Sequence, residues 1–388
     1  MNKSLAKIAV VEVVFLITTC ILMAIPVYAS SVDYWVKRAP MPNSADELDG
    51  VVANGEVYAI GTNLTPNSNC NYMYDPATNT WTTKTPMPMY QANFAIAAYK
   101  EDIYVIGGVN NLPTGIIQTY DPTTDNWTKK TDMPFAMGFL RAITINEEIY
   151  IMGGALYNWN NMSYSMYGTN NAYDPSNGTW QTLAPMPIPV FRFAMTAVGD
   201  KIYVMGGRMN IGYTTQTQIY DTRTNTWSVG EPVPVSTHYS IAVATTGVSS
   251  PIRIVYIGGA GEPWSTKTEN PQGNGFTLTP SNNGPCPTQI YNPQTNTWTN
   301  GTSVLTPRDS NELLVNVNDT IYAIGGFDGI SNIATNEQYF PINYQANSLT
   351  AQVPEFPTWI ILLQLMMTAA VASLLIFRRH RKTTKIEQ

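Results

Sequence analysis

A short pattern of an apolar run, two glycines, a tyrosine and a tryptophan recurs along most of this chain. In residues 103–127 the run Ile-Tyr-Val-Ile precedes Gly107-Gly108, and a loop then leads to Tyr120-Asp-Pro and Trp127. The tyrosine and the tryptophan stand seven residues apart in each copy that has both. A repeat of this size cannot bury its apolar faces alone, so its copies must stack on one another.

The copies are spread over most of the chain and differ in few positions. The glycine pairs are Gly107-Gly108, Gly153-Gly154, Gly206-Gly207, Gly258-Gly259 and Gly325-Gly326, and the tyrosine–tryptophan pairs are Tyr74 and Trp81, Tyr120 and Trp127, Tyr173 and Trp180, Tyr220 and Trp227, and Tyr291 and Trp298. The first copy has Gly61-Thr62 in place of two glycines, and the sixth has Tyr339 with no tryptophan after it. We expect these glycines, tyrosines and tryptophans to be structural residues of the repeat.

Each copy predicts four short antiparallel strands. The apolar runs are rich in β-branched and aromatic residues, which is typical of strands, and the glycine pairs are expected to end them. A tight turn such as Asn54-Gly55 or Gly199-Asp200 connects each run to the apolar segment before it. The Asp-Pro sequences after the tyrosines are typical of β-turns, because proline fixes φ and aspartate bonds to nearby backbone.

This combination resembles the kelch repeat, and six copies resemble a six-bladed kelch β-propeller, an all-β fold. The resemblance covers most of the chain and assigns residues 30–345 to the propeller. Trp35 begins an outer strand that has no blade before it, whereas the sixth copy lacks its outer strand. We therefore expect the N-terminal strand to complete the last blade, because closing the ring removes two exposed sheet edges.

The two ends of the chain predict export and attachment to a membrane. Residues 1–29 combine two lysines, an apolar run and Val27-Tyr28-Ala29, which is typical of a signal peptide cleaved after Ala29. The alternative is an uncleaved N-terminal anchor. Residues 346–357 form a polar linker, residues 358–377 are an uncharged span long enough to cross a bilayer, and residues 378–388 are a basic tail expected in the cytoplasm.

Pro354-Glu355-Phe356, followed by the apolar span and the basic cluster, resembles the PEF-CTERM sorting signal of archaeal surface proteins. The resemblance implies an archaeal protein whose tail is cut near this motif and replaced by a lipid. The expected location is the cell membrane, with the propeller outside the cell.

The balance of charge and the cysteines narrow the possible partners. Residues 30–355 contain 14 basic and 25 acidic residues, a net charge of −11, so a nucleic-acid partner is not expected. Cys70 and Cys286 occupy similar places in the first and fifth copies, which are not neighbours in a six-bladed ring. A disulfide needs Cα atoms within about 7 Å, so we expect none unless the long loop of the fifth copy carries Cys286 across.

The Asn-x-Ser/Thr sequences are candidate glycosylation sites in an exported protein. They lie at Asn63, Asn126, Asn161, Asn177, Asn300 and Asn318. A chain rich in asparagine and threonine also forms such sequences by chance, so we expect only some of them to carry glycans.

Two segments between a glycine pair and the next tyrosine are longer than the others and contain aromatic residues. They are residues 155–171, with Tyr157, Trp159, Tyr164 and Tyr167, and residues 260–287, with Trp264. Long loops on a rigid scaffold often bind ligands, and aromatic rings with amide neighbours suit sugar rings. The alternative is that these aromatic side chains pack within their own loops.

A second candidate site is a set of polar residues near the starts of the innermost strands. Its members are Glu47, Asp49, Asn93, Arg141, Arg192, His238, Arg308 and Asp309. Their positions predict a ring around the mouth of the central channel, where charged groups at a concave surface are a candidate ligand site. The alternative is a structural ring that satisfies backbone groups and water.

Catalytic and metal-binding patterns are mostly missing from the sequence. A galactose-oxidase-like propeller would imply copper held by two histidines and two tyrosines, but the exported part has His238 alone. No zinc spacing and no Gly-x-Ser-x-Gly motif is present, so no metal or cofactor is expected. The leading hypothesis is a non-catalytic module that binds a protein or glycan. The alternative is a carbohydrate-active enzyme of the sialic-acid mutarotase type, which is also a kelch propeller.

Overall fold

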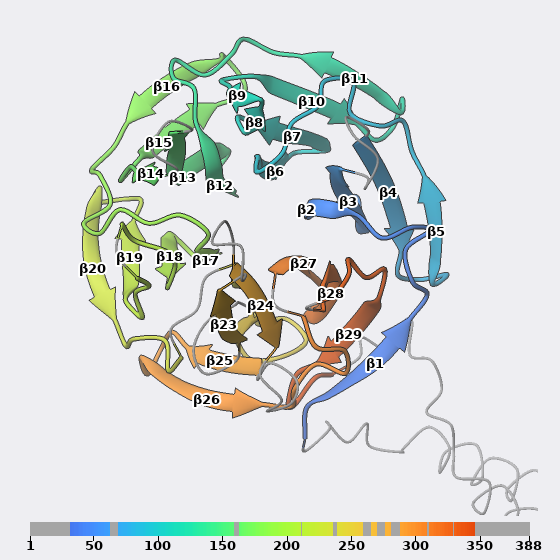
Figure 1. The fold of residues 1–388 in the computed structure, drawn as a ribbon. Helices are drawn as coiled ribbons and strands as arrows, with labels where there is room; N and C mark the ends of the chain where they lie inside the picture. Colours follow the sequence, from blue (N-terminus) through green and yellow to red (C-terminus); the bar gives the residue numbers. More distant parts are fainter. Residues whose placement is uncertain are drawn as a thin grey trace, which may run out of the picture. The chain divides into compact units, whose positions relative to one another are not determined.

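Six antiparallel sheets, each with a path of four strands, stand as blades around a central axis (Figure 1). The computed structural model describes residues 32–62, 69–158, 163–210, 212–235, 239–258, 265–269, 276–280, 288–308, 310–328 and 330–345. Residues 1–344 form one compact unit and residues 345–388 a second. The predicted signal peptide, linker, transmembrane span and basic tail lie outside the described residues. Within the described ranges, no helix is long and apolar enough to span a membrane.

The first three blades follow one another along the chain. Blade one contains β2 (Asp46–Ala53), β3 (Glu56–Thr62), β4 (Asn69–Asp75) and β5 (Thr80–Thr83). Blade two contains β6 (Ala95–Tyr99), β7 (Asp102–Ile106), β10 (Ile117–Asp121) and β11 (Asn126–Lys129), with a small hairpin of β8 (Val109–Asn110) and β9 (Leu112–Pro113). Blade three contains β12 (Gly138–Ile145), β13 (Glu148–Asn158), β15 (Asn170–Asp174) and β16 (Thr179–Thr182), and β14 (Ser163–Met166) pairs with β13.

The last three blades include the only one that joins the two ends of the described propeller. Blade four contains β17 (Ala194–Val198), β18 (Lys201–Met205), β19 (Thr217–Asp221) and β20 (Thr226–Gly230). Blade five contains β21 (Ile241–Ala244), β22 (Ile254–Ile257), β25 (Thr288–Asn292) and β26 (Thr297–Gly301), with a hairpin of β23 (Ser265–Glu269) and β24 (Phe276–Pro280). Blade six contains β27 (Ser310–Val317), β28 (Thr320–Phe327), β29 (Asn336–Phe340) and the N-terminal β1 (Tyr34–Arg38).

The apolar core lies between neighbouring blades. Six clusters of buried side chains each combine residues of two adjacent blades, including one that joins blade six to blade one. In that cluster Leu313 and Ile324 of blade six pack with Val57 and Tyr74 of blade one. Each sheet therefore buries both faces only because it has a neighbour on each side.

The ring is closed by β1, which is the closure that the unmatched Trp35 indicates. Trp35 pairs with Tyr339 in the register of β1 and β29. The Asp33 carboxylate accepts a hydrogen bond from the Tyr339 hydroxyl at 2.6 Å and one from the Thr302 backbone N–H at 2.8 Å. The Trp35 Nε1–H donates to the Thr302 carbonyl at 2.8 Å. The N-terminal segment is thus bonded both to the last strand and to the segment that follows blade five.

In the other blades, too, the tyrosine and the tryptophan of the repeat bind the segment that precedes the blade, and this explains their constant spacing. In blade two, the Tyr120 hydroxyl and the Thr85 backbone N–H both donate to the turn residue Asp125, at 2.6 and 2.9 Å. The Trp127 Nε1–H donates to the Thr85 carbonyl at 2.8 Å. The tyrosine, the turn and the tryptophan together clamp the segment that arrives from the preceding blade. Asn79, Asn225 and Asn296 accept the equivalent bonds in blades one, four and five.

The tryptophans of the repeat differ from its tyrosines in burial, a distinction that the sequence analysis did not make. The paired tyrosines are buried, whereas the tryptophans on the outer strands are only half-buried: Trp81, Trp127, Trp180, Trp227 and Trp298. The outer strand of each blade has a strand partner on its inner side alone, so part of each indole ring faces solvent. These tryptophans are therefore structural residues of the outer edge and do not belong to the buried core.

Hydrogen bonds from the indole rings explain why tryptophan is used at this edge. The Nε1–H groups of Trp81, Trp227 and Trp298 donate to the carbonyls of Ala39, Ala184 and Glu231, at 2.7, 2.8 and 3.0 Å. Trp180 of blade three packs against two aromatic rings, with its ring centre 4.7 Å from that of Tyr173 and 6.1 Å from that of Phe135. The contacts of the repeat tryptophan in blade three therefore differ from those in the other blades.

The prediction that the glycine pairs end their strands is wrong for blades three and six. In blade three β13 continues through Gly153-Gly154, because the extra strand β14 gives it a new partner. In blade six β28 continues through Gly325-Gly326, because the early start of β27 pairs with it as far as Phe327. The glycines are needed for other reasons: Gly153 has φ +69°, and a Cβ atom there would lie 2.3 Å from the Phe193 ring.

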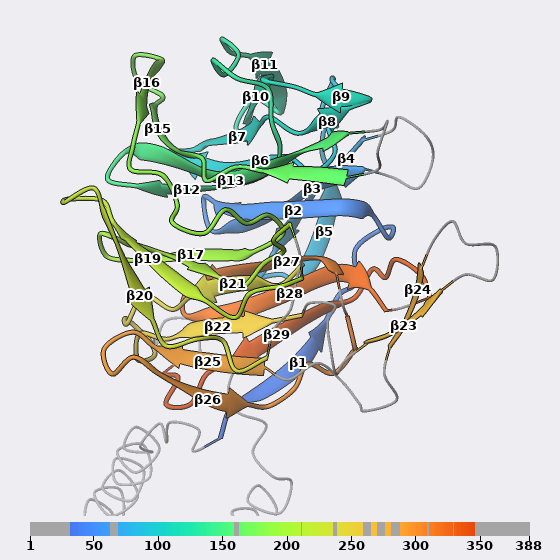
Figure 2. The same cartoon turned by 60° about the vertical axis from the view of Figure 1, so that its left-hand side comes forward.

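The two long segments that the sequence analysis treated as loops contain β-hairpins. In blade three β13 pairs with β14, and in blade five β23 pairs with β24. The hairpins β8–β9 and β23–β24 lie on the same side of the ring (Figure 2). Extended pairing in these segments was missed because the apolar alternation that marks the blade strands is absent from them.

The candidate glycosylation sites and the two cysteines differ in exposure and in whether the structure describes them. Asn126, Asn177, Asn300 and Asn318 are exposed, whereas Asn63 and Asn161 lie outside the described residues. Cys70 is a buried free thiol whose pKa is raised by burial to about 12, and Cys286 lies outside the described residues.

Asp319 links blade six to blade five and makes a testable contribution to stability. Its buried carboxylate accepts hydrogen bonds from the backbone N–H groups of residues 246, 248, 249 and 250. Burial alone would raise the Asp319 pKa, but the hydrogen bonds outweigh it and the pKa is lowered. Stability from this group is therefore complete above its unfolded pKa of about 3.9 and is lost as the pH falls towards the lower folded pKa.

We expect Asp319→Ala to lower the free energy of unfolding at neutral pH by about 3 kcal/mol, because buried N–H groups lose a charged acceptor. The control is Asp328→Ala, which removes an aspartate that bonds only two N–H groups in an exposed turn. Urea unfolding at pH 7 and near pH 3 measures both effects. Equal loss in the two variants, or an Asp319→Ala effect that is the same at both pH values, would contradict this role.

Candidate functional site

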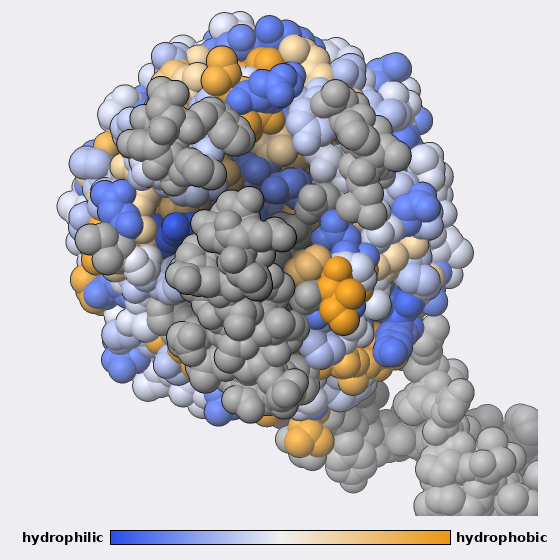
Figure 3. Space-filling view, viewed as in Figure 1, coloured by the Kyte–Doolittle hydropathy of each residue, from blue (hydrophilic) through white to orange (hydrophobic). Residues whose placement is uncertain are grey.

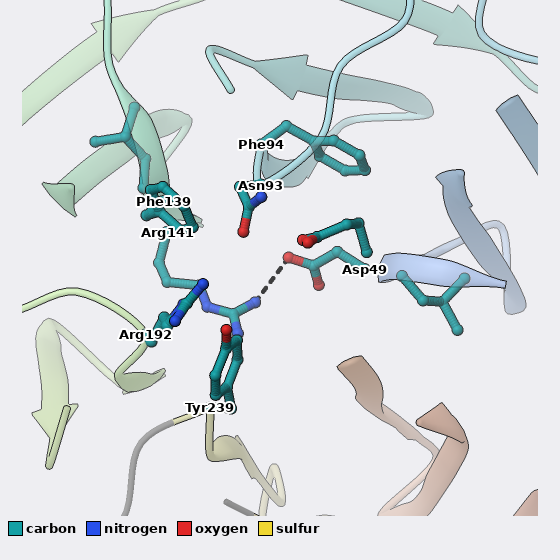
Figure 4. A pocket seen from close by; sticks show the side chains of 10 residues that line it. Asp49, Asn93, Phe94, Phe139, Arg141, Arg192 and Tyr239 are labelled. Atoms are coloured by element: carbon teal, nitrogen blue, oxygen red, sulfur yellow. Dashed lines mark hydrogen bonds and ion pairs between the residues drawn. The ribbon is translucent and has the colours of Figure 1, made fainter. Parts of the chain in front are cut away.

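A small pocket of about 60 Å³ lies at the mouth of the central channel, where blades one to five begin their innermost strands. Five predicted residues line it: Glu47, Asp49, Asn93, Arg141 and Arg192. Phe139 and Tyr239 line it as well (Figure 4). Hydrophilic side chains gather in the hollow at the centre of this face (Figure 3). Five of the eight polar residues that the sequence analysis grouped therefore lie at one place in the fold.

At the mouth, each of these five blades places one residue with a left-handed backbone. The residues are Glu47, Asn93, Phe139, Arg192 and Tyr239, with φ between 46° and 66°. This conformation is unfavourable for side chains as large as Phe, Arg and Tyr. Hydrogen bonds between blades help to hold it, since the Phe139 N–H donates to the Asn93 carbonyl at 2.8 Å and the Tyr239 N–H donates to the Arg192 carbonyl at 2.9 Å.

An ion pair joins blade one to blade three across the mouth. The Arg141 Nη1 lies 2.7 Å from the Asp49 Oδ2, and the two side chains are 25% and 13% exposed. Burial raises the pKa of the Asp49 carboxyl, and the Arg141 guanidinium opposes that rise. Both residues also line the channel cavity beneath, which has a volume of about 320 Å³ and walls made by the innermost strands. The pair thus stands between the mouth and the channel.

Arg192 is surrounded by aromatic rings. Its guanidinium carbon lies 4.0 Å from the centre of the Tyr239 ring, 5.0 Å from Phe139, 5.3 Å from Phe191 and 5.6 Å from Tyr164. A guanidinium stacked in this way is attracted by the ring faces and keeps its N–H donors at its edge. Its side chain is therefore held in place before any ligand arrives.

Arg208 extends this arrangement on the same rings. Its guanidinium carbon lies 5.4 Å from the Tyr164 ring centre and 5.7 Å from that of Phe191. The rings of Tyr164 and Phe191 are themselves 4.7 Å apart. We call Arg192, Arg208, Tyr164, Phe191 and Tyr239 the arginine–aromatic cluster.

Tyr239 remains a hydrogen-bond donor at neutral pH. Burial raises the pKa of its hydroxyl to about 12, although the positive charge of Arg192 opposes the rise. Glu47 contributes to the rise, which places its negative charge near the same hydroxyl. The mouth therefore combines acidic, basic and phenolic groups within a few residues of one another.

The placement of Arg308 corrects the sequence analysis. Its guanidinium is fully buried inside blade six, where Nη2 lies 3.0 Å from Glu337 Oε2 and Nη1 donates to the Gly325 carbonyl at 3.1 Å. Arg308 was expected at the mouth because it follows a proline motif, but a buried carboxylate in its own blade holds it away. Its role is structural.

The predicted aromatic residues are divided. Tyr164 belongs to the arginine–aromatic cluster, and Tyr157 packs against it with ring centres 4.8 Å apart. Tyr167 is 41% exposed. Part of this set therefore packs within its own hairpin, as the alternative interpretation anticipated. Trp159, Trp264, His238 and Asp309 lie outside the described residues.

Phe139, Phe191, Arg208 and Tyr239 were not predicted as site residues. The sequence contains a signal for Phe139 and Tyr239. The residue seven positions before the turn that follows the innermost strand lies at the mouth in each of the first four blades: Glu47, Asn93, Phe139 and Arg192. Tyr239 occupies the equivalent place in blade five. No group of three His, Cys, Asp or Glu side chains in the described part of the chain is arranged to hold a metal.

Comparison with known proteins identifies the repeat. A model of the Kelch motif matches residues 92–134 and residues 189–234, which contain blades two and four. This chain is a propeller of kelch repeats. The solved structure of YjhT matches the propeller with a TM-score of 0.63 at 18% identity, covering 77% of this chain and 95% of that one. At this identity the likeness concerns the fold alone.

Matches to curated kelch proteins are local. Kelch-like protein 4 of Homo sapiens is 39% identical over 64 residues, which is 16% of this chain and 9% of that protein. Kelch-like protein 7 of Rattus norvegicus is 32% identical over 75 residues, 19% of this chain and 13% of that protein. The chain thus matches about a tenth of the length of these relatives, and the likeness is confined to the repeat.

Proposed function

We propose that this kelch propeller is a membrane-anchored binding module at the cell surface, and that it holds a protein or glycan partner on the face around the channel mouth. The observation that carries the proposal is the mouth, where five blades present a left-handed residue and arginines stack on aromatic rings. Unfavourable backbone of this kind is concentrated at binding and active sites. Kelch proteins generally mediate interactions with other proteins, which agrees with a binding role.

The rim around the mouth supports the same proposal. Leu112, Tyr167, Tyr213 and Ile330 are exposed, and each belongs to the segment that follows the glycine pair in a different blade. These segments are rich in Asn, Gly, Ser, Thr and Tyr, a composition that adaptable binding surfaces share. The apolar tips supply contact area, and the amides and hydroxyls supply hydrogen bonds.

The experiment is a glycan-array screen of the full-length chain, followed by affinity measurements on the hits. We expect the double variant Tyr167→Ala/Tyr213→Ala to bind about tenfold more weakly, because exposed aromatic side chains carry much of the energy at such surfaces. The control is Val229→Ala, which alters an exposed apolar residue on the outer strand β20. Binding that depends on Val229 and is insensitive to the rim would overturn the proposal. Recovery of the chain from the soluble fraction of its host cells would contradict the membrane anchor in this proposal.

A second candidate function is sugar chemistry of the sialic-acid mutarotase type. The observation in its favour is that Asp49, whose pKa is raised by burial, shares the mouth with Glu47 and two arginines. A protonated carboxyl group would serve as the proton donor, and the arginines would bind the carboxylate of the sugar. Anomer exchange of sialic acid, followed by NMR, decides between the two. Exchange above the uncatalysed rate that disappears in Asp49→Asn would replace the binding module with an enzyme.

A further inference from the structure

Arg192 and Arg208 differ from the other arginines of the propeller. Arg141, Arg223 and Arg308 form ion pairs with Asp49, Asp200 and Glu337. Arg38 donates to the Gln338 side chain, and Arg253 donates to the Ile252 carbonyl. Among the described residues, the guanidinium groups of Arg192 and Arg208 have ring contacts but neither a carboxylate partner nor a hydrogen-bond acceptor. In a propeller with 24 acidic residues, two arginines that contact the same rings and have no carboxylate partner are unusual.

Both arginines are half-buried against aromatic rings, which restrict the positions of their side chains. Both guanidinium carbons lie within 5.6 Å of the Tyr164 ring centre, so the two positive charges contact the same ring. The Arg192 Nε is a buried donor without an acceptor in the described structure. A buried donor in this state is unfavourable, and an oxyanion in the mouth would satisfy it and gain charge-assisted hydrogen bonds.

We propose that Arg192 and Arg208 bind an oxyanion, a carboxylate or a sulfate ester, that is carried by a glycan. This inference rests on the proposed function and assigns a ligand class to the same face. The arginines share one anionic ligand, and Tyr164 and Phe191 hold their guanidinium groups in place for it. Arg141 is assigned to Asp49 instead, because the carboxylate of Asp49 already forms an ion pair with it at 2.7 Å.

The surroundings of the two arginines favour a glycan over an acidic peptide. Residues 153–171 and residues 206–216 contain one charged residue, Arg208, so these two segments contribute no carboxylate to the surroundings of the two arginines. Tyr167 and Tyr213 are exposed there, at 41% and 40%. Segments without acidic residues and with exposed tyrosine rings suit the apolar faces and hydroxyl edges of sugars that flank a single acidic group.

The extra hairpin of blade three has a role in this site. Tyr164, on β14, contacts Phe139 at 5.5 Å and Phe191 at 4.7 Å between ring centres, as well as both arginines. Tyr164 is thus a positioning residue, and the hairpin that carries it completes the cluster. Tyr164→Leu is expected to weaken selection for charged over uncharged ligand more than it weakens binding of the uncharged ligand.

The test uses the full-length chain and three matched probes: a galactose oligosaccharide, its uronic-acid counterpart and its sulfated counterpart. We expect at least one charged probe to bind about tenfold more tightly than the neutral one, and this preference to decline as salt is added. Arg192→Gln and Arg208→Gln should each remove the preference, whereas Arg223→Gln, which alters an exposed arginine of the same blade, should keep it. Because Arg192 is packed among rings, thermal melting is measured for every variant, and Arg208→Gln supplies an independent result.

The comparison of the two charged probes identifies the oxyanion. Equal binding of the neutral and charged probes, with no effect of either arginine variant, overturns the oxyanion site but leaves the binding module in place. Tighter binding of a poly-glutamate peptide than of any charged oligosaccharide overturns the glycan and assigns the site to an acidic peptide. If neither the unaltered chain nor the rim variants bind any glycan or peptide, the proposed function itself is contradicted.

Discussion

Deletion of residues 31–42 is expected to abolish the cooperative unfolding of the propeller. The deletion removes the outer strand of blade six, so that β29 loses its outer partner and becomes the exposed edge of that sheet. It also removes Asp33, whose carboxylate bonds Tyr339 and Thr302, and Met41, which is buried between blades six and one. The expected result in thermal and urea unfolding, followed by circular dichroism, is a broad transition or aggregation at a temperature where the intact chain is folded.

Single substitutions separate the contributions to this closure. Asp33→Ala leaves the Tyr339 hydroxyl buried without its charged acceptor, and we expect it to cost about 3 kcal/mol. Lys37→Ala, on the same strand but away from the bonds to Thr302, is the control and should change little. A truncated chain that melts like the intact one, with the same dependence on urea, would show that β1 does not close the ring.

The architecture of the blades was predictable because it depends on short patterns that repeat. Each Tyr-x₆-Trp spacing encodes one local arrangement on the outer strand. In blades one, two, four and five, one turn residue accepts hydrogen bonds from the tyrosine hydroxyl and from the segment that arrives from the preceding blade. The missing tryptophan after Tyr339 and the unmatched Trp35 predicted the closing strand for the same reason. The strand limits at the glycine pairs depended on partners that are particular to one blade, such as β14, and were missed in blades three and six.

The candidate site was predictable only in part. Polar residues at the start of each innermost strand could be grouped, because the fold brings equivalent positions of all blades to one mouth. Phe191 and Arg208 could not, since their place in the site depends on side-chain stacking with Tyr164 from another blade. Arg308 was assigned to the mouth by its position in the sequence, yet the carboxylate of Glu337 determines where its side chain lies.

Replacement of Glu337 by alanine is expected to lower the free energy of unfolding by about 3–5 kcal/mol, because it leaves the buried Arg308 guanidinium without its counterion. Both side chains are fully buried, and Glu337 also accepts hydrogen bonds from the Thr306 hydroxyl and the Leu305 N–H, the latter at 3.2 Å. Urea unfolding at neutral pH measures the effect. Because the pair lies within blade six and away from the mouth, binding of the mouth-face ligand should be unchanged in the fraction that is folded.

Blade two supplies the matched control for this ion pair. There the Gln118 side chain donates to Gln91, and Gln91 donates to the carbonyl of Gly107, the first glycine of its pair. Arg308 makes the same contact with Gly325, and Glu337 precedes its tyrosine by two residues as Gln118 does. The double variant Arg308→Gln/Glu337→Gln therefore replaces a buried ion pair with a neutral pair that the same fold already accommodates, and buried ion pairs often gain little over neutral replacements. We expect it to unfold within about 1.5 kcal/mol of the unaltered chain. A double variant that is less stable than Glu337→Ala would show that blade six depends on the charges themselves and not only on filled hydrogen bonds.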